Sequence, residues 1–386
     1  EKEIEVRPEF FMIDMTNKCN LRCNYCLRNL EQEENCISTE KLRDIGKFIT
    51  TYCDEYKIAN ISVQAWGGEP LLEKNKIIAL TKFITPQKTK VHYSIETNAT
   101  LLTNDVIEEL YKNHIGIGIS IDGDRKCHDL QRTFVSGKGS YDTVKKNLLQ
   151  AQRYYKNKIG TITTITKQTA VHIEKIIEHL VLDLHISNIK LNFVHASTYT
   201  HGQNQCLNTQ EIADTELRIL YKIIELQERG YDVMEHNIFI KLKNLLFREY
   251  ADICLSCGCC GGEKMIVFDM DGNIYPCELT DDASFVIGSI YKKESLIEQI
   301  KMTIDKDKAF FKMKKAVECE KCYWKFFCRG GCTVRALSEK RQMEVIDIDH
   351  IECAINQVLY PALMELVLRK PHIVNQMLGE DLLVDE

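Results

Sequence analysis

The sequence contains no run of about 18 consecutive apolar residues, the length that a membrane-spanning helix requires. Its opening segment, EKEIEVRPEF, also lacks the basic stretch followed by an apolar stretch that marks a signal peptide. From these two absences we expect a cytoplasmic protein that does not enter a membrane.

The chain also lacks an excess of basic residues, since 50 Lys and Arg stand against 56 Asp and Glu, for a formal net charge of −6. Proteins that bind nucleic acids gather Lys and Arg on one face to neutralise phosphates. We therefore expect no nucleic acid among its partners. Proline is scarce at 6 residues while 44% of the residues are hydrophobic, a composition typical of a folded globular protein.

Cysteine, in contrast, is abundant, with 17 among 386 residues. A cytoplasmic protein keeps its thiols reduced, so disulfides explain this number poorly, and an odd number cannot pair completely. The cysteines therefore indicate ligands for a metal or an iron–sulfur cluster. The length indicates two domains, or one large domain with an appendage.

Short apolar runs alternate with amphipathic segments over the first half of the chain. The runs predict six buried strands, at 10–16, 60–66, 91–97, 115–122, 159–166 and 188–194. Helices are predicted between them at 38–56, 103–113, 140–155 and 169–184, most of them opened by Ser or Thr. This alternation predicts an α/β fold with a parallel sheet. Six units are too few for a closed eight-stranded barrel, and a doubly wound open sheet is the alternative.

The rhythm changes after residue 208. A long helix is predicted at 209–230, then a cysteine-dense region at 254–353 and a closing helix at 355–370. We therefore divide the chain into a first domain at 1–210, a helical bridge at 211–253, a cysteine-rich domain at 254–360, and a C-terminal helix and tail at 361–386.

Three cysteines lie close together directly after the first predicted strand, in the segment TNKCNLRCNYC. Cys19, Cys23 and Cys26 are thus expected in a loop at the carboxyl end of the sheet, where parallel α/β folds keep their reactive groups. Structural zinc usually takes four ligands, whereas three thiolates leave one iron of a cluster open for another group. Zinc with a distant fourth ligand is the alternative.

The CxxxCxxC spacing, with Tyr25 before the last cysteine, resembles the signature of the radical S-adenosylmethionine (SAM) enzymes. The resemblance implies that the three thiolates hold a 4Fe-4S cluster whose open iron chelates S-adenosylmethionine. It also implies that the reduced cluster cleaves this cofactor to a 5′-deoxyadenosyl radical, which abstracts hydrogen from an unactivated carbon.

The second predicted strand ends in WGGEP, which resembles the GGEP motif of the same family. Gly67 and Gly68 permit a close approach of the backbone. The resemblance implies that Glu69 meets the ammonium group of the cofactor. Standing alone, the segment would indicate only a turn.

The resemblance implies further cofactor-binding residues at the following strand ends and in the segment HDLQR, namely Asn98, Ser120, Asp122 and Arg132. Arginine suits a carboxylate because its planar guanidinium forms paired hydrogen bonds. Three of these residues have another interpretation. Asn98 could cap a helix, Asp122 could begin an Asx turn, and Arg132 could form a solvated salt bridge.

The second cysteine region combines a Gx4C element at 272–277 with a CxxCx5CxxxC element at 319–332. This resembles the SPASM domain of radical SAM enzymes, which implies two auxiliary 4Fe-4S clusters. A zinc ribbon would explain Cys319 and Cys322 but not the remaining cysteines. The implied ligands of one cluster are Cys319, Cys322, Cys328 and Cys353. Those of the other are Cys277 and Cys332, together with two of the four cysteines at 254–260, of which Cys259 is the first choice and Cys254 the second.

Together these resemblances imply a partial (β/α)6 TIM-like barrel followed by a small cysteine-rich SPASM domain and a C-terminal helix. They imply three 4Fe-4S clusters and S-adenosylmethionine as cofactors, and a flavodoxin- or ferredoxin-type reductant as a partner.

Enzymes with this domain architecture commonly modify peptides or proteins. We expect a peptide maturase that forms a crosslink, a thioether from a cysteine, with oxidation of Cys or Ser to formylglycine in sulfatases as the alternative. The sulfatase-maturing group has an aspartate, implied to accept a proton, where this chain has Glu278, whose alternative role is a solvated carboxylate. Only 18 residues precede Cys19, fewer than a leader-recognition module needs, which weighs against a peptide substrate.

A non-catalytic iron–sulfur electron-transfer protein is an alternative of another class. The WGGEP segment argues against it, because an electron carrier needs no cavity for a second cofactor.

Overall fold

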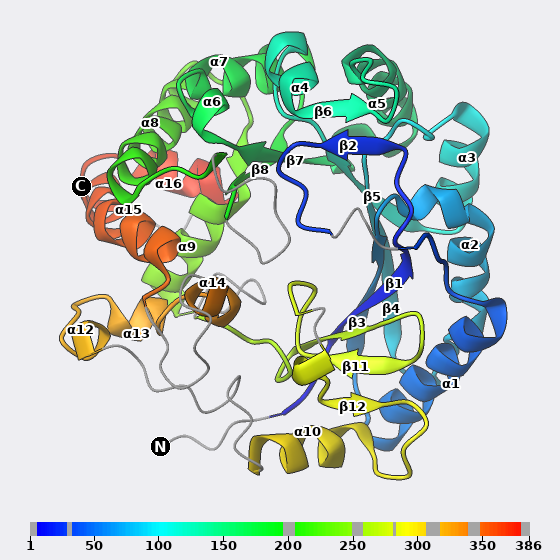
Figure 1. Ribbon diagram of the computed structural model, residues 1–386. Coiled ribbons are helices and arrows are strands. Elements are labelled where there is room, and N and C mark those ends of the chain that lie inside the picture. The colour runs from blue at the N-terminus through cyan, green and yellow to red at the C-terminus, as the bar shows by residue number, and fades with distance from the viewer. Residues whose placement is uncertain are drawn as a thin grey trace.

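The computed structural model describes residues 6–28, 33–195, 205–248, 258–280, 283–305, 317–338 and 348–379. Its centre is a curved parallel sheet with helices on the outer side (Figure 1). The six predicted strands are confirmed. They are β1 (Phe10–Thr16), β3 (Asn60–Gly67), β4 (Lys90–Thr97), β5 (Ile115–Ser120), β7 (Gly160–Ile165) and β8 (Asn188–Phe193).

These six strands are neighbours in chain order, each parallel to the next. A doubly wound sheet would reverse its strand order part-way, so that alternative is wrong. A sheet built in one direction curves without closing, and the result is a partial barrel. A short strand, β9 (Met234–Glu235), which the sequence pattern did not predict, extends it beyond β8.

Strands from the cysteine-rich region continue the sheet on its other side. β10 (Met265–Phe268) pairs in parallel with β1, and β11 (Asn273–Tyr275) and β12 (Gly288–Ser289) follow in antiparallel pairing. The ten strands thus form one sheet in the order β12-β11-β10-β1-β3-β4-β5-β7-β8-β9. Backbone hydrogen bonds therefore join the C-terminal region to the first strand of the barrel.

The helices that follow the barrel strands lie outside the sheet (Figure 1). They are α1 (Thr39–Glu55), α2 (Lys74–Phe83), α3 (Asn104–Lys112), α4 (Arg125–Gln131), α5 (Tyr141–Tyr155), α6 (Lys167–Ala170), α7 (Ile173–Glu178) and α8 (Thr209–Glu228). The helix predicted at 169–184 is therefore interrupted, and it ends in a π-helical turn at His179–Asp183. A helix at α2 was not predicted, because only Ile77 and Leu80 of its ten residues are buried.

Further helices and short segments complete the described chain. The C-terminal helices are α9 (His236–Phe247), α10 (Leu296–Asp305), α12 (Val317–Glu320), α13 (Lys325–Cys328), α14 (Thr333–Ser338), α15 (His350–Arg369) and α16 (Pro371–Leu378). Three single 3₁₀ turns lie at Pro70–Glu73, Lys156–Lys158 and Ala283–Phe285. The closing helix starts at His350, earlier than predicted, because the Asp349 side chain caps it by accepting from the N–H of Glu352.

Helix α15 is the one helix in the described part of the chain that is long and apolar enough to cross a membrane. This is weak evidence, because a helix of a protein core meets the same criterion. In the structure α15 packs against α8 and α16, and Leu359, Tyr360 and Leu363 are buried there.

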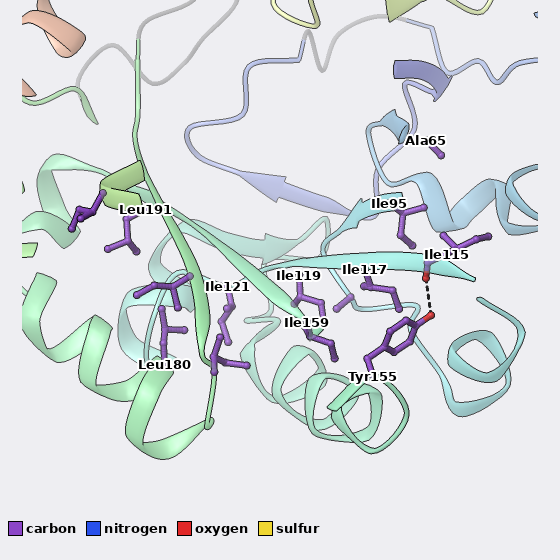
Figure 2. Close-up of a cluster of buried hydrophobic side chains, with 14 of the residues drawn as sticks. Ala65, Ile95, Ile115, Ile117, Ile119, Ile121, Tyr155, Ile159, Leu180 and Leu191 are labelled. Carbon is purple, nitrogen blue, oxygen red and sulfur yellow. Dashed lines mark hydrogen bonds between the residues drawn. The ribbon is translucent and has the colours of Figure 1, made fainter. Parts of the chain in front are cut away.

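The barrel core lies between the sheet and its outer helices. The segment IGIGIS shows how it forms, because Ile115, Ile117 and Ile119 are buried on one face of β5 while the intervening glycines lie on the other face. Figure 2 shows these side chains packed with isoleucines and leucines of neighbouring elements. The large residues thus fill the layer between the sheet and its outer helices, and the small residues between them leave room on the barrel's interior face.

A buried hydrogen bond secures this layer, from the hydroxyl of Tyr155 to the carbonyl of Ile115 at 2.8 Å (Figure 2). We predict that Tyr155→Phe lowers the free energy of unfolding by about 1 kcal/mol, because the carbonyl loses a buried donor. Tyr221→Phe, at a side chain that is 58% exposed, is the control and should have no effect. Urea unfolding of both variants measures the difference, and equal midpoints would contradict the prediction.

Candidate active site

The GGEP segment lies against the loop that leads to the first cysteines. The N–H of Gly68 donates to the carbonyl of Thr16 at 2.7 Å, and the N–H of Glu69 donates to the carbonyl of Lys18 at 2.8 Å. A Cβ at Gly67 would lie 2.3 Å from the Thr16 carbonyl oxygen, and one at Gly68 would lie 2.2 Å from that of Lys18. Gly67 also has φ of +140°. Both positions therefore require glycine.

Glu69 joins the ends of β3 and β4. Its side chain is fully buried, and Oε1 accepts from Thr97 Oγ1 at 2.7 Å and from the N–H of Leu71 at 3.0 Å. Oε2 accepts from the N–H of Asn98 at 2.8 Å. Burial raises the pKa of Glu69, and these three hydrogen bonds act in the opposite direction. The carboxylate thus fixes the loops around the site, and its contact with a cofactor stays a prediction.

The three cysteines of the first cluster share one small region. Cys23 ends β2 (Leu21–Cys23), and the N–H of Cys26 donates to the carbonyl of Cys23 at 3.2 Å. Burial raises the pKa of Cys23 to about 12 and also raises that of Cys19, and Cys26 adds to both shifts. Burial outweighs Arg132, which acts to lower the pKa of both thiols, so iron would have to displace their protons when it binds.

No three His, Cys, Asp or Glu side chains lie close enough to hold a single metal ion, within the residues that the structure describes. A 4Fe-4S cluster spaces its thiolates further apart than one tetrahedral zinc ion does. The ligation of iron by Cys19, Cys23 and Cys26 stays a prediction.

Tyr25, Asp122 and Arg132 form a buried network beside these thiols. The Tyr25 hydroxyl donates to Asp122 Oδ2 at 2.7 Å and accepts from Arg132 Nη1. Asp122 also accepts from Gln131 Nε2 at 2.9 Å and from the N–H of Thr164 at 3.0 Å. Asp122 is fully buried and bonded to distant residues, so the Asx-turn interpretation of its side chain is wrong.

Arg132 lies opposite Cys23, because β2 pairs antiparallel with β6 (Arg132–Phe134). It is 8% exposed, which excludes a solvated salt bridge. Burial acts to lower the pKa of Arg132, but Cys23, Tyr25 and Asp122 outweigh it and hold that pKa well above its ordinary value. The Nε atom is buried and has no hydrogen-bond partner. An unsatisfied donor of this kind fits the carboxylate of S-adenosylmethionine, as the sequence analysis expects.

Asn98 and Ser120 lie at the remaining strand ends. The Asn98 side chain donates to Asn20 Oδ1 at 2.9 Å and lies 3.8 Å from Cys19 Sγ, so it faces the cysteine loop. Helix α3 is preceded by Thr103, and the helix-cap interpretation of Asn98 is therefore wrong. Ser120 ends β5 and is half-buried.

A residue that the sequence analysis missed is Arg28, two positions after Cys26. Its Nη2 donates to both carboxylate oxygens of Asp14, at 2.7 and 2.8 Å, and its guanidinium lies 4.4 Å from the ring centre of Trp66. Arg28 thereby holds the far end of the cysteine loop to β1 and β3. The acidic Asp14 within the apolar run FFMIDM was the available signal.

Two groups of cysteines gather in the C-terminal region. Cys319, Cys322, Cys328 and Cys353 line one cavity of about 120 Å³. Cys259, Cys277 and Cys332 lie near one another, since burial raises the pKa of Cys277 well above its ordinary value and both of the other thiols add to the shift. The structure thus brings together seven of the eight auxiliary ligands that the resemblance implies. Cys254, the eighth, lies outside the described residues.

Glu278 extends from this second group toward the barrel. Its Oε2 is buried without a hydrogen-bond partner, so the solvated-carboxylate interpretation is wrong. Burial raises the pKa of Glu278, Glu96 of β4 raises it further, and Lys190 of β8 acts to lower it. The carboxylate therefore lies within electrostatic reach of two barrel strands.

Comparison with known proteins gives the class to which this site belongs. Residues 13–180 match the model of the Radical SAM superfamily. Residues 13–180 therefore form a radical SAM domain, a kind of domain that uses a 4Fe-4S cluster and S-adenosylmethionine, and the protein is an enzyme. The alternative of a non-catalytic electron-transfer protein is wrong.

Its relatives include maturating enzymes. The chain is 26% identical over 327 residues to the cysteine-type anaerobic sulfatase-maturating enzyme of Clostridium novyi, covering 82% of this chain and 85% of that protein. It is 23% identical over 373 residues to the radical SAM cyclopropyl synthase TigE of Paramaledivibacter caminithermalis, covering 91% and 73%. The structure of anSMEcpe with bound AdoMet and Cp18Cys peptide has the same fold, with a TM-score of 0.78, 20% identity, and coverage of 97% and 100%.

The contact of Gly68 with Lys18 yields a prediction about cluster assembly. Gly68→Ala should displace the cysteine loop, because a Cβ cannot lie 2.2 Å from a backbone oxygen. We expect loss of the absorbance and iron of the first cluster in anaerobically reconstituted protein. Gly116→Ala is the matched control, since its Cβ would meet its nearest neighbour at an ordinary 3.6 Å. Full iron content in Gly68→Ala would show that the close contact is dispensable.

Proposed function

We propose that this enzyme is a peptide maturase that forms a thioether crosslink from a cysteine of a ribosomally made peptide. The single observation that carries the proposal is the buried, unpartnered carboxylate oxygen of Glu278 between the barrel and the cysteine-rich region. A thioether requires a base, because the thiol must lose its proton as sulfur bonds to carbon. The similarity to a sulfatase-maturating enzyme and to a structure with a bound Cp18Cys peptide supports a peptide or protein substrate.

Cys19, Cys23 and Cys26 would hold the cluster that binds S-adenosylmethionine, and Arg132 Nε would bind the cofactor's carboxylate. When bound, the cluster and S-adenosylmethionine supply a 5′-deoxyadenosyl radical that takes one hydrogen atom from a substrate carbon. Tyr25 and Asp122 would orient Arg132, while Gly67, Gly68 and Glu69 hold the loops that enclose the cofactor.

The reaction must also remove one proton and one electron from the substrate. Glu278 would take the thiol proton, and together with the abstracted hydrogen atom this leaves a peptide short of two hydrogens. We propose that the groups needed to accept the electron are two further 4Fe-4S clusters. One would be held by Cys319, Cys322, Cys328 and Cys353, and the other by Cys254, Cys259, Cys277 and Cys332, which makes three clusters in all.

We propose that the chain is divided into a first domain at 1–210, a helical bridge at 211–253, a cysteine-rich domain at 254–360, and a C-terminal helix and tail at 361–386. We also propose that a flavodoxin- or ferredoxin-type reductant in the cytoplasm supplies the electrons.

Formylglycine formation is the second candidate, because similarity to the sulfatase-maturating enzymes extends over most of both chains. Glu278 differs from the aspartate expected in that group, and its longer side chain carries the carboxylate further from the backbone. Two probes separate the candidates: the Cp18Cys peptide, and cysteine-containing peptides encoded beside the gene. Loss of two hydrogens in a mass spectrum indicates a crosslink, and conversion of cysteine to an aldehyde would replace the thioether proposal.

The first cluster can be tested by the combined variant Cys19→Ala, Cys23→Ala and Cys26→Ala. Anaerobic reduction with S-adenosylmethionine should give no 5′-deoxyadenosine, while iron held in the C-terminal region remains. Cys36→Ala is the control, because that half-buried cysteine has no assigned role. Continued cofactor cleavage in the combined variant would mean that this loop does not hold the cluster.

The role of Glu278 can be separated from cofactor cleavage. Glu278→Gln should still form 5′-deoxyadenosine but should lower product formation by about 100-fold or more, since the amide cannot accept the thiol proton. Glu294→Gln changes an exposed carboxylate and serves as the control. Single-turnover assays that quantify both 5′-deoxyadenosine and peptide product give the ratio, and an unchanged ratio would remove Glu278 from the reaction.

A further inference from the structure

A chain of buried charges joins three helices of the C-terminal region. Arg335 of α14 donates from Nε and Nη2 to Asp349 Oδ2, at 3.0 and 2.7 Å, and from Nη2 to Glu352 Oε2 at 3.2 Å. Glu352 of α15 also pairs through Oε1 with Lys241 of α9. Asp349, Glu352 and Lys241 are each no more than 3% exposed. Water does not screen these charges, so they act strongly on their surroundings.

Asp349 is the junction of this chain, and it contacts the backbone beside both auxiliary sites. Its Oδ2 accepts from the N–H of Cys332 at 2.7 Å. Its Oδ1 accepts from the N–H of Glu352 at 3.2 Å, which caps α15, and its own carbonyl accepts from the N–H of Cys353 at 2.9 Å. One residue therefore fixes the main chain of a proposed ligand of each cluster.

The hydrogen bond from the Cys332 N–H to Asp349 affects the reduction potential expected of a cluster at this site. Hydrogen bonds from N–H groups to cluster sulfurs, and nearby charges, set the reduction potential of an iron–sulfur cluster. Here the N–H of Cys332 donates to the carboxylate of Asp349 and not to a cluster sulfur. Arg335 lies within electrostatic reach of the Cys332 thiol. Burial raises the pKa of that thiol to about 12, and Arg335 acts to lower it. The Asp349–Arg335 pair thus balances a negative and a positive charge beside one ligand.

We propose that Asp349 and Arg335 are positioning residues that fix the two auxiliary clusters relative to each other and set the reduction potential of the cluster held by Cys332. This inference rests on the auxiliary clusters of the proposed function. Removing Arg335 leaves the buried Asp349 carboxylate without its guanidinium partner, and removing Asp349 leaves Arg335 paired with Glu352 alone, so the two single substitutions shift the potential in opposite directions.

The test uses the full chain carrying Cys19→Ala, Cys23→Ala and Cys26→Ala, so that all iron belongs to the auxiliary sites. A redox titration followed by electron paramagnetic resonance measures each cluster's potential. Arg335→Gln leaves a carboxylate and lowers the potential of the cluster at Cys332, whereas Asp349→Asn leaves a guanidinium and raises it. A role limited to stability would not produce shifts of opposite sign.

Arg218→Gln is the matched control, since Arg218 forms a similar two-fold pair with Glu174, at 2.6 and 2.5 Å, on helices of the barrel. It should leave both potentials unchanged. If Arg335→Gln or Asp349→Asn fails to fold, Arg335→Lys provides the measurement. Lysine keeps the charge but cannot reach Asp349 and Glu352 together, so a smaller decrease in potential is expected.

Two outcomes overturn the inference, and they are distinguishable. If the parent chain binds about eight irons, as two 4Fe-4S clusters require, but the potentials of the folded variants equal those of the parent, the inference alone fails. If the parent chain binds no iron, the auxiliary clusters of the proposed function fail and the inference fails with them.

Discussion

The site depends on one steric constraint, the contact between the backbone of the GGEP segment and the backbone that leads into the cysteine loop. At Gly68 even a methyl group would meet the Lys18 carbonyl oxygen at 2.2 Å. This contact brings the end of β3 against the end of β1, and Glu69 then extends the connection to β4 by accepting three hydrogen bonds. This junction positions the polar side chains around the thiols.

The open sheet explains how a second domain reaches that junction. Because the barrel does not close, β1 keeps a free edge, and β10 pairs with it in parallel. Cys277 and Glu278, which follow β11, are thereby directed to the barrel side of the C-terminal region, where Glu96 and Lys190 influence Glu278. An unclosed barrel exposes unpaired backbone groups at its edge, and here the edge is satisfied by the region that supplies the proposed base.

The sequence predicted the strands well because each is a short run rich in apolar or small residues. In IGIGIS the residues of one face are buried and those of the other face are half-buried. The two auxiliary cysteine groups were predicted through the resemblance of the Gx4C and CxxCx5CxxxC elements to the SPASM domain. Helix α2 was missed because tertiary packing of only two residues decides it. The interruption of the helix predicted at 169–184 also has no local breaker, since neither proline nor glycine occurs within it.

The residues that sequence analysis missed are polar groups whose partners are distant along the chain. Arg28 binds Asp14 across the cysteine loop, and Arg335 binds Asp349 across the second region. No periodicity or motif records such pairs, because a single charged residue on a sequence is most often a solvated one. Yet a charge that is buried must find a counter-charge or destabilise the fold. Ion pairs withdrawn from solvent are thus the part of this site that only the folded chain can reveal, and the arginine of each pair lies within three residues of a proposed cluster ligand.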